Sequence, residues 1–261
     1  MLLTIDAGNT NLTLASYHLG ASLPEDRLVF HSRMATDRSQ TPDQLAVAML
    51  EIFRLHGVER ADCTDAVIGS VVSEMTDSLA EAATLLTGRK PLVLAPGVKT
   101  GLNIRIDNPA QLGADLIAGA VAAKALYPLP CLVVDLGTAT KISALGADGA
   151  FLGCCIAPGI AVSLEALSAR TSQLPRVALR APANAIGTDS VTSMQSGTVF
   201  GTAHMIDGLL GRMERELGAQ ASVVATGGLS GSIVCHCARA MEHNEDLVLL
   251  GLKEIYRRNR M

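Results

Sequence analysis

Hydrophobic and polar positions along the chain predict two similar β-hairpins, one in each half of the sequence. Residues 2–15 and residues 132–145 each contain an apolar run that ends in an aspartate, then a glycine turn, then alternating residues. Such a run followed by period-two alternation is typical of a buried strand and a returning strand. The aspartates, Asp6 and Asp135, hold equivalent positions. The repeat predicts two similar subdomains that face one another across a cleft.

The rest of the pattern alternates between helical and extended segments. Apolar residues at helical spacing predict helices at residues 42–56, 75–86, 109–126, 160–169, 191–215 and 248–258. Thr41 would cap the first helix, with Pro42 at its first position. Short apolar runs predict strands at residues 66–72, 91–94 and 222–226. This alternation indicates a layered α/β architecture.

The residue types in the two hairpins suit a bound nucleotide. A carboxylate at a strand end can hold magnesium or its waters, and glycine lets backbone amides approach a phosphate. Two such hairpins would hold the phosphates from both sides, although each by itself could be an ordinary turn. Gly227 and Gly228 follow the strand at 222–226, where the chain could pass close to an adenosine.

Composition and charge narrow the classes of partner. The chain has no Trp and a formal net charge of −4, so we expect neither aromatic base stacking nor a basic nucleic-acid surface. The N-terminus lacks the basic start of a signal peptide, and residues 217–238 are too polar and glycine-rich for a membrane helix. We expect a cytoplasmic protein without nucleic-acid or membrane partners. The six cysteines contain no C-x-x-C pair and are expected to be reduced thiols.

Asp115 is the candidate for proton-transfer chemistry. It lies in the first turns of the helix predicted at 109–126, where the helix dipole stabilises a carboxylate anion. A carboxylate within hydrogen-bond reach can accept the proton that an attacking alcohol loses. From the residue type alone, a carboxylate that only caps the helix is the simpler interpretation.

The motifs, in combination and in this order, resemble those of the type III pantothenate kinases of the actin-like ATPase superfamily. They are Asp6-x-Gly-Asn-Thr, Asn108-Pro109-x-x-Leu112-Gly113-Ala114-Asp115, Asp135-x-Gly-Thr-Ala, Pro158-Gly159, Leu174-Pro175, Met194-Gln195-Ser196-Gly197 and Thr226-Gly227-Gly228. The resemblance runs nearly end to end. It implies an α/β fold of two actin-like (ribonuclease H-like) subdomains, 1–117 and 118–261, with a nucleotide cleft between them and dimerisation helices in the second.

The resemblance also implies an activity and a site. The activity is ATP-dependent phosphorylation of the primary hydroxyl of pantothenate to 4'-phosphopantothenate, the first step of coenzyme A biosynthesis, by a homodimer. Asp115 is the implied general base, Asp6 the magnesium ligand (directly or through water), and Asp135 the ligand of a monovalent cation, K⁺ or NH₄⁺. The implied ATP and phosphate contacts are Asp6, Gly8, Asn9, Thr10, Asn11, Thr13, Gly137, Thr138, Gly227 and Gly228. The implied substrate contacts are Gly113, Ala114, Asp115, Leu116, Ile106 and Ser190.

Four positions depart from the family pattern. Leu116 stands where the family has Arg, Ile106 where it has Tyr, Ser190 where it has Thr, and Lys141 where it has Thr. The first two remove polar groups from the acceptor pocket, and each lost contact would weaken pantothenate binding by about ten- to a hundredfold. One interpretation is a divergent pantothenate kinase or a kinase for a related hydroxyl acceptor. The other is a non-catalytic relative, such as a regulatory protein or the partner subunit of a heteromer. The carboxylates Asp6, Asp115 and Asp135 favour the enzyme.

Overall fold

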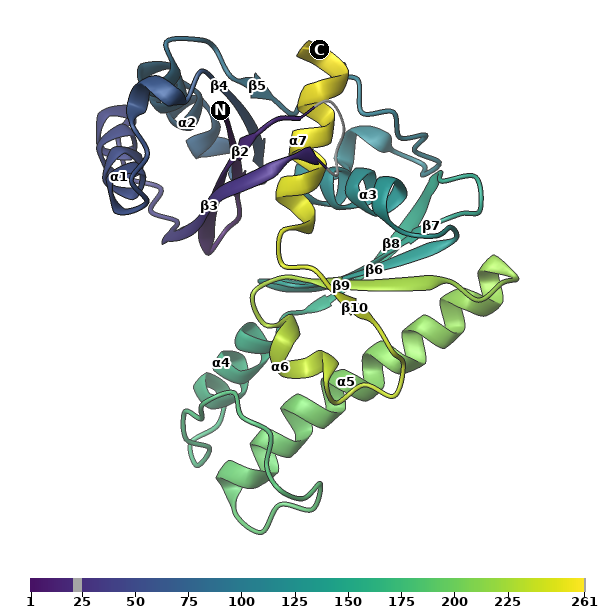
Figure 1. Ribbon diagram of the computed structural model, residues 1–261. Coiled ribbons are helices and arrows are strands. Elements are labelled where there is room, and N and C mark those ends of the chain that lie inside the picture. The colour runs from purple at the N-terminus through teal and green to yellow at the C-terminus, as the bar shows by residue number, and fades with distance from the viewer. Residues whose placement is uncertain (21–24, 261) are drawn as a thin grey trace. The chain divides into compact units, whose positions relative to one another are not determined.

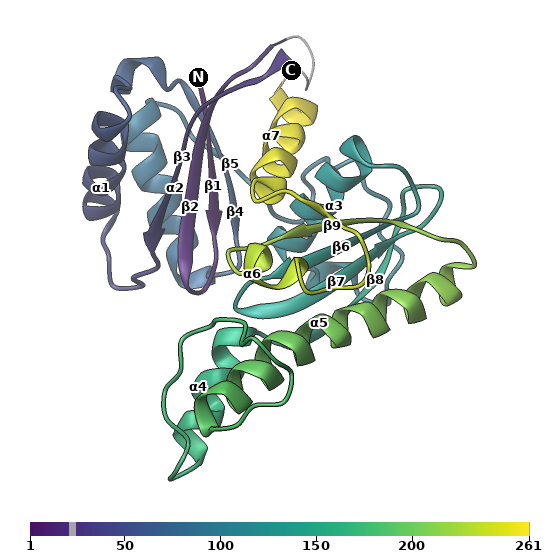
Figure 2. The same cartoon turned by 60° about the horizontal axis from the view of Figure 1, so that its bottom comes forward.

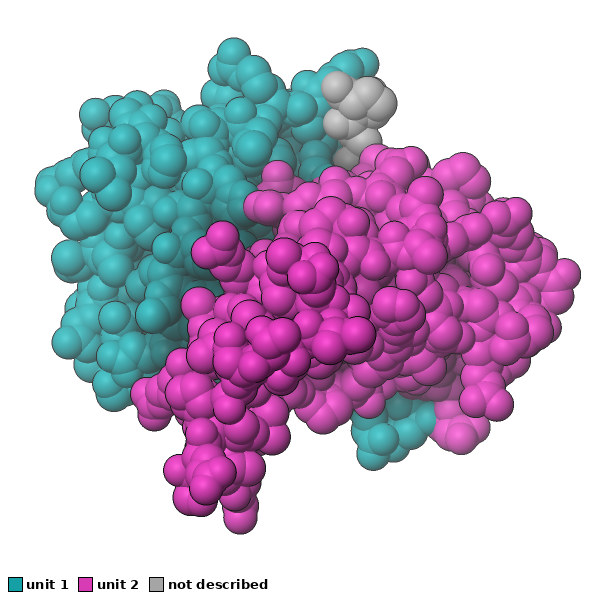
Figure 3. Space-filling model, turned by 90° about the horizontal axis from the view of Figure 1, so that it is seen from below, with its two compact units in different colours: residues 1–101, 108–122, 247–261 teal, residues 102–107, 123–246 magenta. Residues whose placement is uncertain are grey.

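The computed structural model describes residues 1–20 and 25–260, and the chain divides into two compact units. Unit 1 comprises residues 1–101, 108–122 and 247–261, and unit 2 comprises residues 102–107 and 123–246 (Figure 3). The boundary expected after residue 117 falls after residue 122, and the units differ from the expected division in two further places. The C-terminal segment returns to unit 1, and the short segment 102–107 belongs to unit 2.

The two units repeat one sheet topology. Unit 1 has the strand order β3-β2-β1-β4-β5, and unit 2 has the matching order β8-β7-β6-β9-β10. The central strand is β1 in unit 1 and β6 in unit 2. In each order as written, the two strand pairs before and up to the central strand are antiparallel, and the two pairs that follow it are parallel. The strands are β1 (Leu2–Ala7), β2 (Asn11–His18), β3 (Arg27–Ala35), β4 (Asp65–Ser70), β5 (Leu92–Val93), β6 (Cys131–Leu136), β7 (Ala139–Leu145), β8 (Phe151–Pro158), β9 (Ser222–Thr226) and β10 (Glu242–His243). The internal repeat expected from the hairpins is confirmed.

Helices cover both faces of the unit 1 sheet (Figures 1 and 2). α1 (Pro42–Leu55) and α2 (Ser73–Thr87) bury a core of apolar side chains against β1 and β4, and α7 (Leu247–Arg260) lies on the opposite face. α1 begins as expected, because the Thr41 side chain accepts from the Gln44 N–H in a capping box. The segment 109–126 is not one helix: η3 (Pro109–Gln111) ends before Gly113, and α3 (Ala114–Leu126) begins after it. Another 3₁₀ helix, η2 (Arg60–Asp62), precedes β4.

A buried cluster of charged side chains connects α7 to the rest of unit 1. Lys253 Nζ lies 2.7 Å from Asp26 Oδ2, and both side chains are almost fully buried. Arg257 also pairs with Asp26, and the Lys253 ammonium lies 4.6 Å from the centroid of the Tyr17 ring. Because removing one member of a buried pair strands the other charge, this cluster specifies where α7 docks. The resemblance implies that this helix belongs to the second subdomain, whereas the structure packs it in unit 1.

Unit 2 packs its helices on one face of its sheet. α5 (Ser190–Leu217) and α6 (Ser230–Val234) share a core with β6, β7 and β9, and α4 (Ile160–Arg170) contacts the N-terminal part of α5. α4 and this part of α5 extend side by side away from the sheet (Figures 1 and 2). Among the described residues, no helix combines the length and hydropathy needed to cross a membrane.

Candidate active site

The first hairpin places Asp6 directly across from Thr13 in the antiparallel register of β1 and β2. Its turn closes through Gly8, whose N–H donates to the Asn11 carbonyl at 3.0 Å. Asn9 and Thr10 at the tip are exposed. The turn therefore presents backbone and side-chain donors of the kind that bind phosphate.

Residues after β3 hold this turn from the side. The Thr36 hydroxyl donates to the Gly8 carbonyl at 2.7 Å, and the Thr36 N–H donates to the Thr10 carbonyl at 3.0 Å. Arg38 Nη2 donates to Asn9 Oδ1 at 2.9 Å, which brings a half-exposed guanidinium to the tip of the hairpin. Sequence reasoning missed Arg38, because only the pairing of β3 with β2 brings it to the turn.

Asp115 lies at the edge of the unit 1 sheet where the first hairpin turns. Asp115 Oδ1 accepts a 2.8 Å hydrogen bond from the N–H of Leu116, which orients the carboxylate at the start of α3. A Cβ atom on Gly113 would lie 2.6 Å from this oxygen and 3.5 Å from Val71. The Val71 N–H in turn donates to the Ala7 carbonyl at the end of β1. The structure thus brings the predicted base and the predicted phosphate hairpin to one edge of the same sheet.

The second hairpin differs from the first in the charge of the residue opposite its aspartate. Asp135 is directly opposite Lys141 in the register of β6 and β7, and Lys141 Nζ lies 2.7 Å from Asp135 Oδ2. The turn closes through the Gly137 N–H, which donates to the Ala139 carbonyl at 3.2 Å, and leaves Thr138 exposed. Asp135 therefore has a protein cation at the position where the resemblance implies a free ion.

The double-glycine turn after β9 meets this hairpin. Gly227 has φ +93°, and a Cβ atom there would lie 2.7 Å from Asp135 Oδ1. The Ser230 hydroxyl donates to the Gly227 carbonyl at 2.5 Å and lies 2.7 Å from His243 Nε2. Because the Ser230 hydrogen is directed at Gly227, the imidazole N–H is the donor to Ser230. Ser230 and His243 thus position the turn, a role that their isolated places in the sequence did not reveal.

Gly159 packs against the turn of the second hairpin in unit 2. A Cβ atom on Gly159 would lie 2.1 Å from the carbonyl oxygen of Thr138, so only glycine lets the start of α4 approach the hairpin this closely. The motif Pro158-Gly159 signalled this position without indicating its role.

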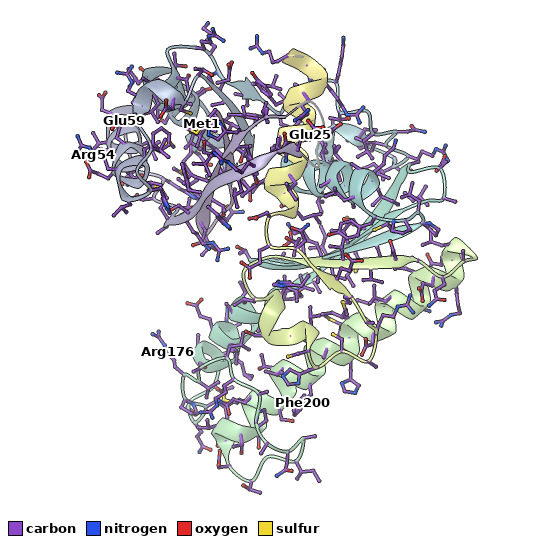
Figure 4. All side chains as sticks on the ribbon, in the orientation of Figure 1. Met1, Glu25, Arg54, Glu59, Arg176 and Phe200 are labelled. Atoms are coloured by element: carbon purple, nitrogen blue, oxygen red, sulfur yellow. The ribbon has the colours of Figure 1, made fainter. Side chains whose placement is uncertain are left out.

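Two hollows adjoin α4. One of about 640 Å³ lies between α4 and α5, and Ser190, the exposed first residue of α5, lines it. The other, of about 340 Å³, is lined by Leu229, directly after the double glycine, and by Arg176, which Figure 4 labels beside α4. Apolar side chains form most of its wall: Ile160, Ala161, Leu164, Val177, Leu179 and Leu229.

The predicted site residues are divided between the units. Unit 1 holds Asp6, Gly8, Asn9, Thr10, Asn11, Thr13, Gly113, Ala114, Asp115 and Leu116. Unit 2 holds Ile106, Asp135, Gly137, Thr138, Ser190, Gly227 and Gly228. Ile106 follows a segment that pairs with β8 through the Arg105 N–H and the Phe151 carbonyl at 2.8 Å. The structure brings together the predicted residues of the first hairpin and Asp115, and separately those of the second hairpin and Gly227.

The donor sets decide which ions suit each hairpin. Among the described residues, no three His, Cys, Asp or Glu side chains cluster as a metal site. Asp6 as a single carboxylate suits magnesium, which commonly combines one or two carboxylates with waters and substrate phosphates. Asp135 does not suit a free monovalent cation, because the Lys141 ammonium already contacts Oδ2.

Comparisons with known proteins agree with this arrangement. The family described as type III pantothenate kinase matches residues 2–212. The type III pantothenate kinase of Geotalea uraniireducens is 40% identical over 260 residues, covering 100% of this chain and 99% of the relative. That of Moorella thermoacetica is 40% identical over 259 residues, covering 99% and 100%.

Solved structures confirm the fold class. The activator of the 2-hydroxyisocaproyl-CoA dehydratase from Clostridium difficile, with bound ADPNP, is 13% identical, covers 98% of this chain and 94% of that chain, and has a TM-score of 0.55. Component A of the (R)-2-hydroxyglutaryl-CoA dehydratase of Acidaminococcus fermentans is 16% identical, covers 100% and 99%, and has a TM-score of 0.55. These likenesses support the α/β, actin-like fold and carry no statement about activity.

Proposed function

The chain belongs to the type III pantothenate kinase family, and we propose that it transfers the terminal phosphoryl group of ATP to the primary hydroxyl of pantothenate. The products are ADP and 4'-phosphopantothenate, in the first step of coenzyme A biosynthesis. The observation that carries the proposal is the position of Asp115, oriented at the sheet edge where the first hairpin turns, in a chain that matches such kinases along its whole length. A cytoplasmic location, where ATP is supplied, is part of the proposal.

Asp115 acts on the acceptor. Its carboxylate accepts the proton that the hydroxyl loses as the new P–O bond forms. The Leu116 N–H holds one carboxylate oxygen, which fixes the direction of the base. Asp6 would hold magnesium, directly or through water, and the ion would neutralise phosphate charge. The Gly8 turn and Arg38 add donors to the phosphates, so transfer depends mainly on positioning and electrostatics.

Unit 2 supplies the remaining nucleotide contacts. Gly137 closes the turn and brings the exposed Thr138 toward the phosphates, and Gly227 and Gly228 let the chain approach the adenosine. The hollow beside Leu229 has the apolar walls that a purine ring requires, and its volume of about 340 Å³ falls in the range of ligand pockets.

We place the acceptor pocket partly at a dimer interface. Ser190 is exposed at the start of α5, next to the hollow between α4 and α5, and suits a contact contributed to a second copy. Gly197, Gly201 and Gly208 are exposed along α5, which allows close approach of another helix. Sedimentation equilibrium at micromolar concentration should give about twice the chain mass of 27.2 kDa. An active monomer would contradict this part of the proposal.

The experiment that tests the function is an assay of ADP release. Purified protein with magnesium and ATP should release ADP only when pantothenate is added, and chelation of magnesium should abolish the reaction. ADP release that is equal with and without pantothenate would identify an ATPase, whereas a kinase for another acceptor would release ADP only when that acceptor is added. ATP binding without turnover under any condition would instead support the non-catalytic relative.

A further inference from the structure

Asp135 and Lys141 form a sheltered ion pair at the base of the second hairpin. Nζ and Oδ2 are 2.7 Å apart, and the two side chains are 14% and 17% exposed for Lys141 and Asp135 respectively. The residues are direct cross-strand partners in the register of β6 and β7, so both side chains lie on one face of the sheet. Because the two side chains are so little exposed to water, salt screens their interaction much less than that of a surface pair.

The other carboxylate oxygen faces the turns that we propose to contact ATP. A Cβ atom on Gly227 would lie 2.7 Å from Asp135 Oδ1, and one on Gly137 would lie 3.4 Å from it. The carboxylate is therefore enclosed by two glycine turns on the Oδ1 side and by the Lys141 ammonium on the Oδ2 side. A cation bound in this space would have to displace Nζ.

We propose that the Lys141 ammonium is the monovalent cation of this site, so that the kinase needs no potassium or ammonium ion. The inference rests on the proposed function, because it concerns a cation requirement of that reaction. A lysine ammonium carries the same single charge as K⁺ or NH₄⁺ and is held on the chain opposite the carboxylate. It neutralises Asp135 beside the phosphate turns, and no free ion has to bind before ATP. The residue opposite Asp135 in the sheet, here Lys141, thereby determines whether the site needs a free cation.

The test compares rates in salts of different cations. The wild type is assayed with ATP and pantothenate supplied as choline salts, and then with K⁺, NH₄⁺ or Na⁺ added. Its rate should be the same in all four. Lys141→Ala opens space beside Asp135, so its rate in choline should fall by about 10- to 100-fold and recover with K⁺ or NH₄⁺.

Two matched variants sharpen the comparison. Lys141→Met fills the space with an uncharged chain of similar length, so it should stay slow in every salt. Lys90→Ala removes an exposed lysine of unit 1 and should behave as the wild type. A wild-type rate that requires K⁺ overturns the inference, and so does Lys141→Ala with full activity in choline. A raised KM for ATP in Lys141→Ala that K⁺ does not correct also overturns it, because Lys141 would then be a phosphate ligand.

Thermal unfolding gives a readout that does not depend on turnover. Replacing choline by K⁺ should leave the Tm of the wild type unchanged. It should raise the Tm of Lys141→Ala by an amount that grows with the logarithm of the K⁺ concentration once K⁺ exceeds its Kd, as mass action requires. If the wild type is inactive in every salt, the proposed function fails while the Tm comparison still decides on the cation. If Lys141→Ala does not fold, the wild-type salt series decides alone. A K⁺-dependent Tm of the wild type overturns the inference.

Discussion

The two hairpins have the same topology and the same aspartate, but the residue opposite that aspartate differs. Asp6 faces Thr13, whereas Asp135 faces Lys141 and forms an ion pair with it. The cross-strand partner of the first aspartate is therefore a neutral hydroxyl side chain, and that of the second is an ammonium group. One cross-strand residue thus separates a hairpin suited to magnesium and phosphate from one that carries its own cation.

The hairpins are also held in place by different means. Side-chain and backbone hydrogen bonds from Thr36 and Arg38 support the first turn. Close backbone approach supports the second, since Gly159 and Gly227 leave no room for a Cβ atom. The first hairpin should consequently tolerate small changes of volume, and the second should not.

The largest effect is expected from Asp115→Asn. This variant tests whether the residue that accepts the proton lies beside the first hairpin. The amide cannot accept the proton of the hydroxyl, so kcat should fall by about 10²–10⁴-fold while ATP affinity is retained. Steady-state kinetics together with nucleotide titration measure both quantities. Asp77→Asn, on the exposed face of α2, is the control and should change neither. Retention of more than about a tenth of wild-type kcat would exclude Asp115 as the base.

Replacing each hairpin aspartate in turn by asparagine should distinguish their roles. Asp6→Asn should raise the magnesium concentration needed for half-maximal rate by about 10- to 100-fold, because it removes a ligand of the ion or of its waters. Asp135→Asn should leave this concentration unchanged, since its partner is Lys141. Titration of the rate with magnesium at saturating ATP distinguishes the two. An equal shift in both variants would show that the hairpins share the metal.

Alanine at three glycines should show how differently the turns are packed. Gly159→Ala and Gly227→Ala should each lower the free energy of unfolding by about 1–3 kcal/mol, because the new methyl group meets backbone or Asp135 and Gly227 has positive φ. Gly8→Ala meets only the Asn11 carbonyl at 3.2 Å and should cost less. Gly211→Ala, which would meet only Arg215 Nη1 at 3.8 Å within α5, serves as the control and should stabilise slightly. Denaturant unfolding measures all four, and equal costs for Gly8 and Gly227 would contradict the contrast.

The smallest effect concerns the acceptor pocket. Restoring the family's polar groups with Ile106→Tyr plus Leu116→Arg should improve kcat/KM for pantothenate about tenfold, with nucleotide affinity unchanged. Arg105 Nη2 pairs with Asp148 Oδ2 at 2.5 Å, so we do not expect Arg105 to replace the missing guanidinium. Arg105→Ala should therefore leave the KM for pantothenate unchanged. Tight pantothenate binding by the wild type would mean that the pocket uses other contacts.

Local pattern predicted the hairpins and most helices, because alternation and capping residues act over a few positions. β3 was not predicted, because Phe30 is the only buried residue of Arg27–Ala35 and the segment is largely polar. The return of α7 to unit 1 depends on Lys253 and Asp26, which lie far apart in the sequence and pair only in the fold. Arg38 and His243 reach the site through strand pairing in the same way. Local rules carry no information about such long-range partners.

The most direct test of the central claim is to identify the phosphorylated product. Purified protein is incubated with magnesium, ATP and pantothenate, with choline as the monovalent cation, and the mixture is followed by ³¹P NMR and mass spectrometry. The account predicts one phosphate monoester on the primary hydroxyl of pantothenate for each ADP formed, and product formation about 10²–10⁴-fold slower with Asp115→Asn. ADP that accumulates while pantothenate stays unmodified would contradict it.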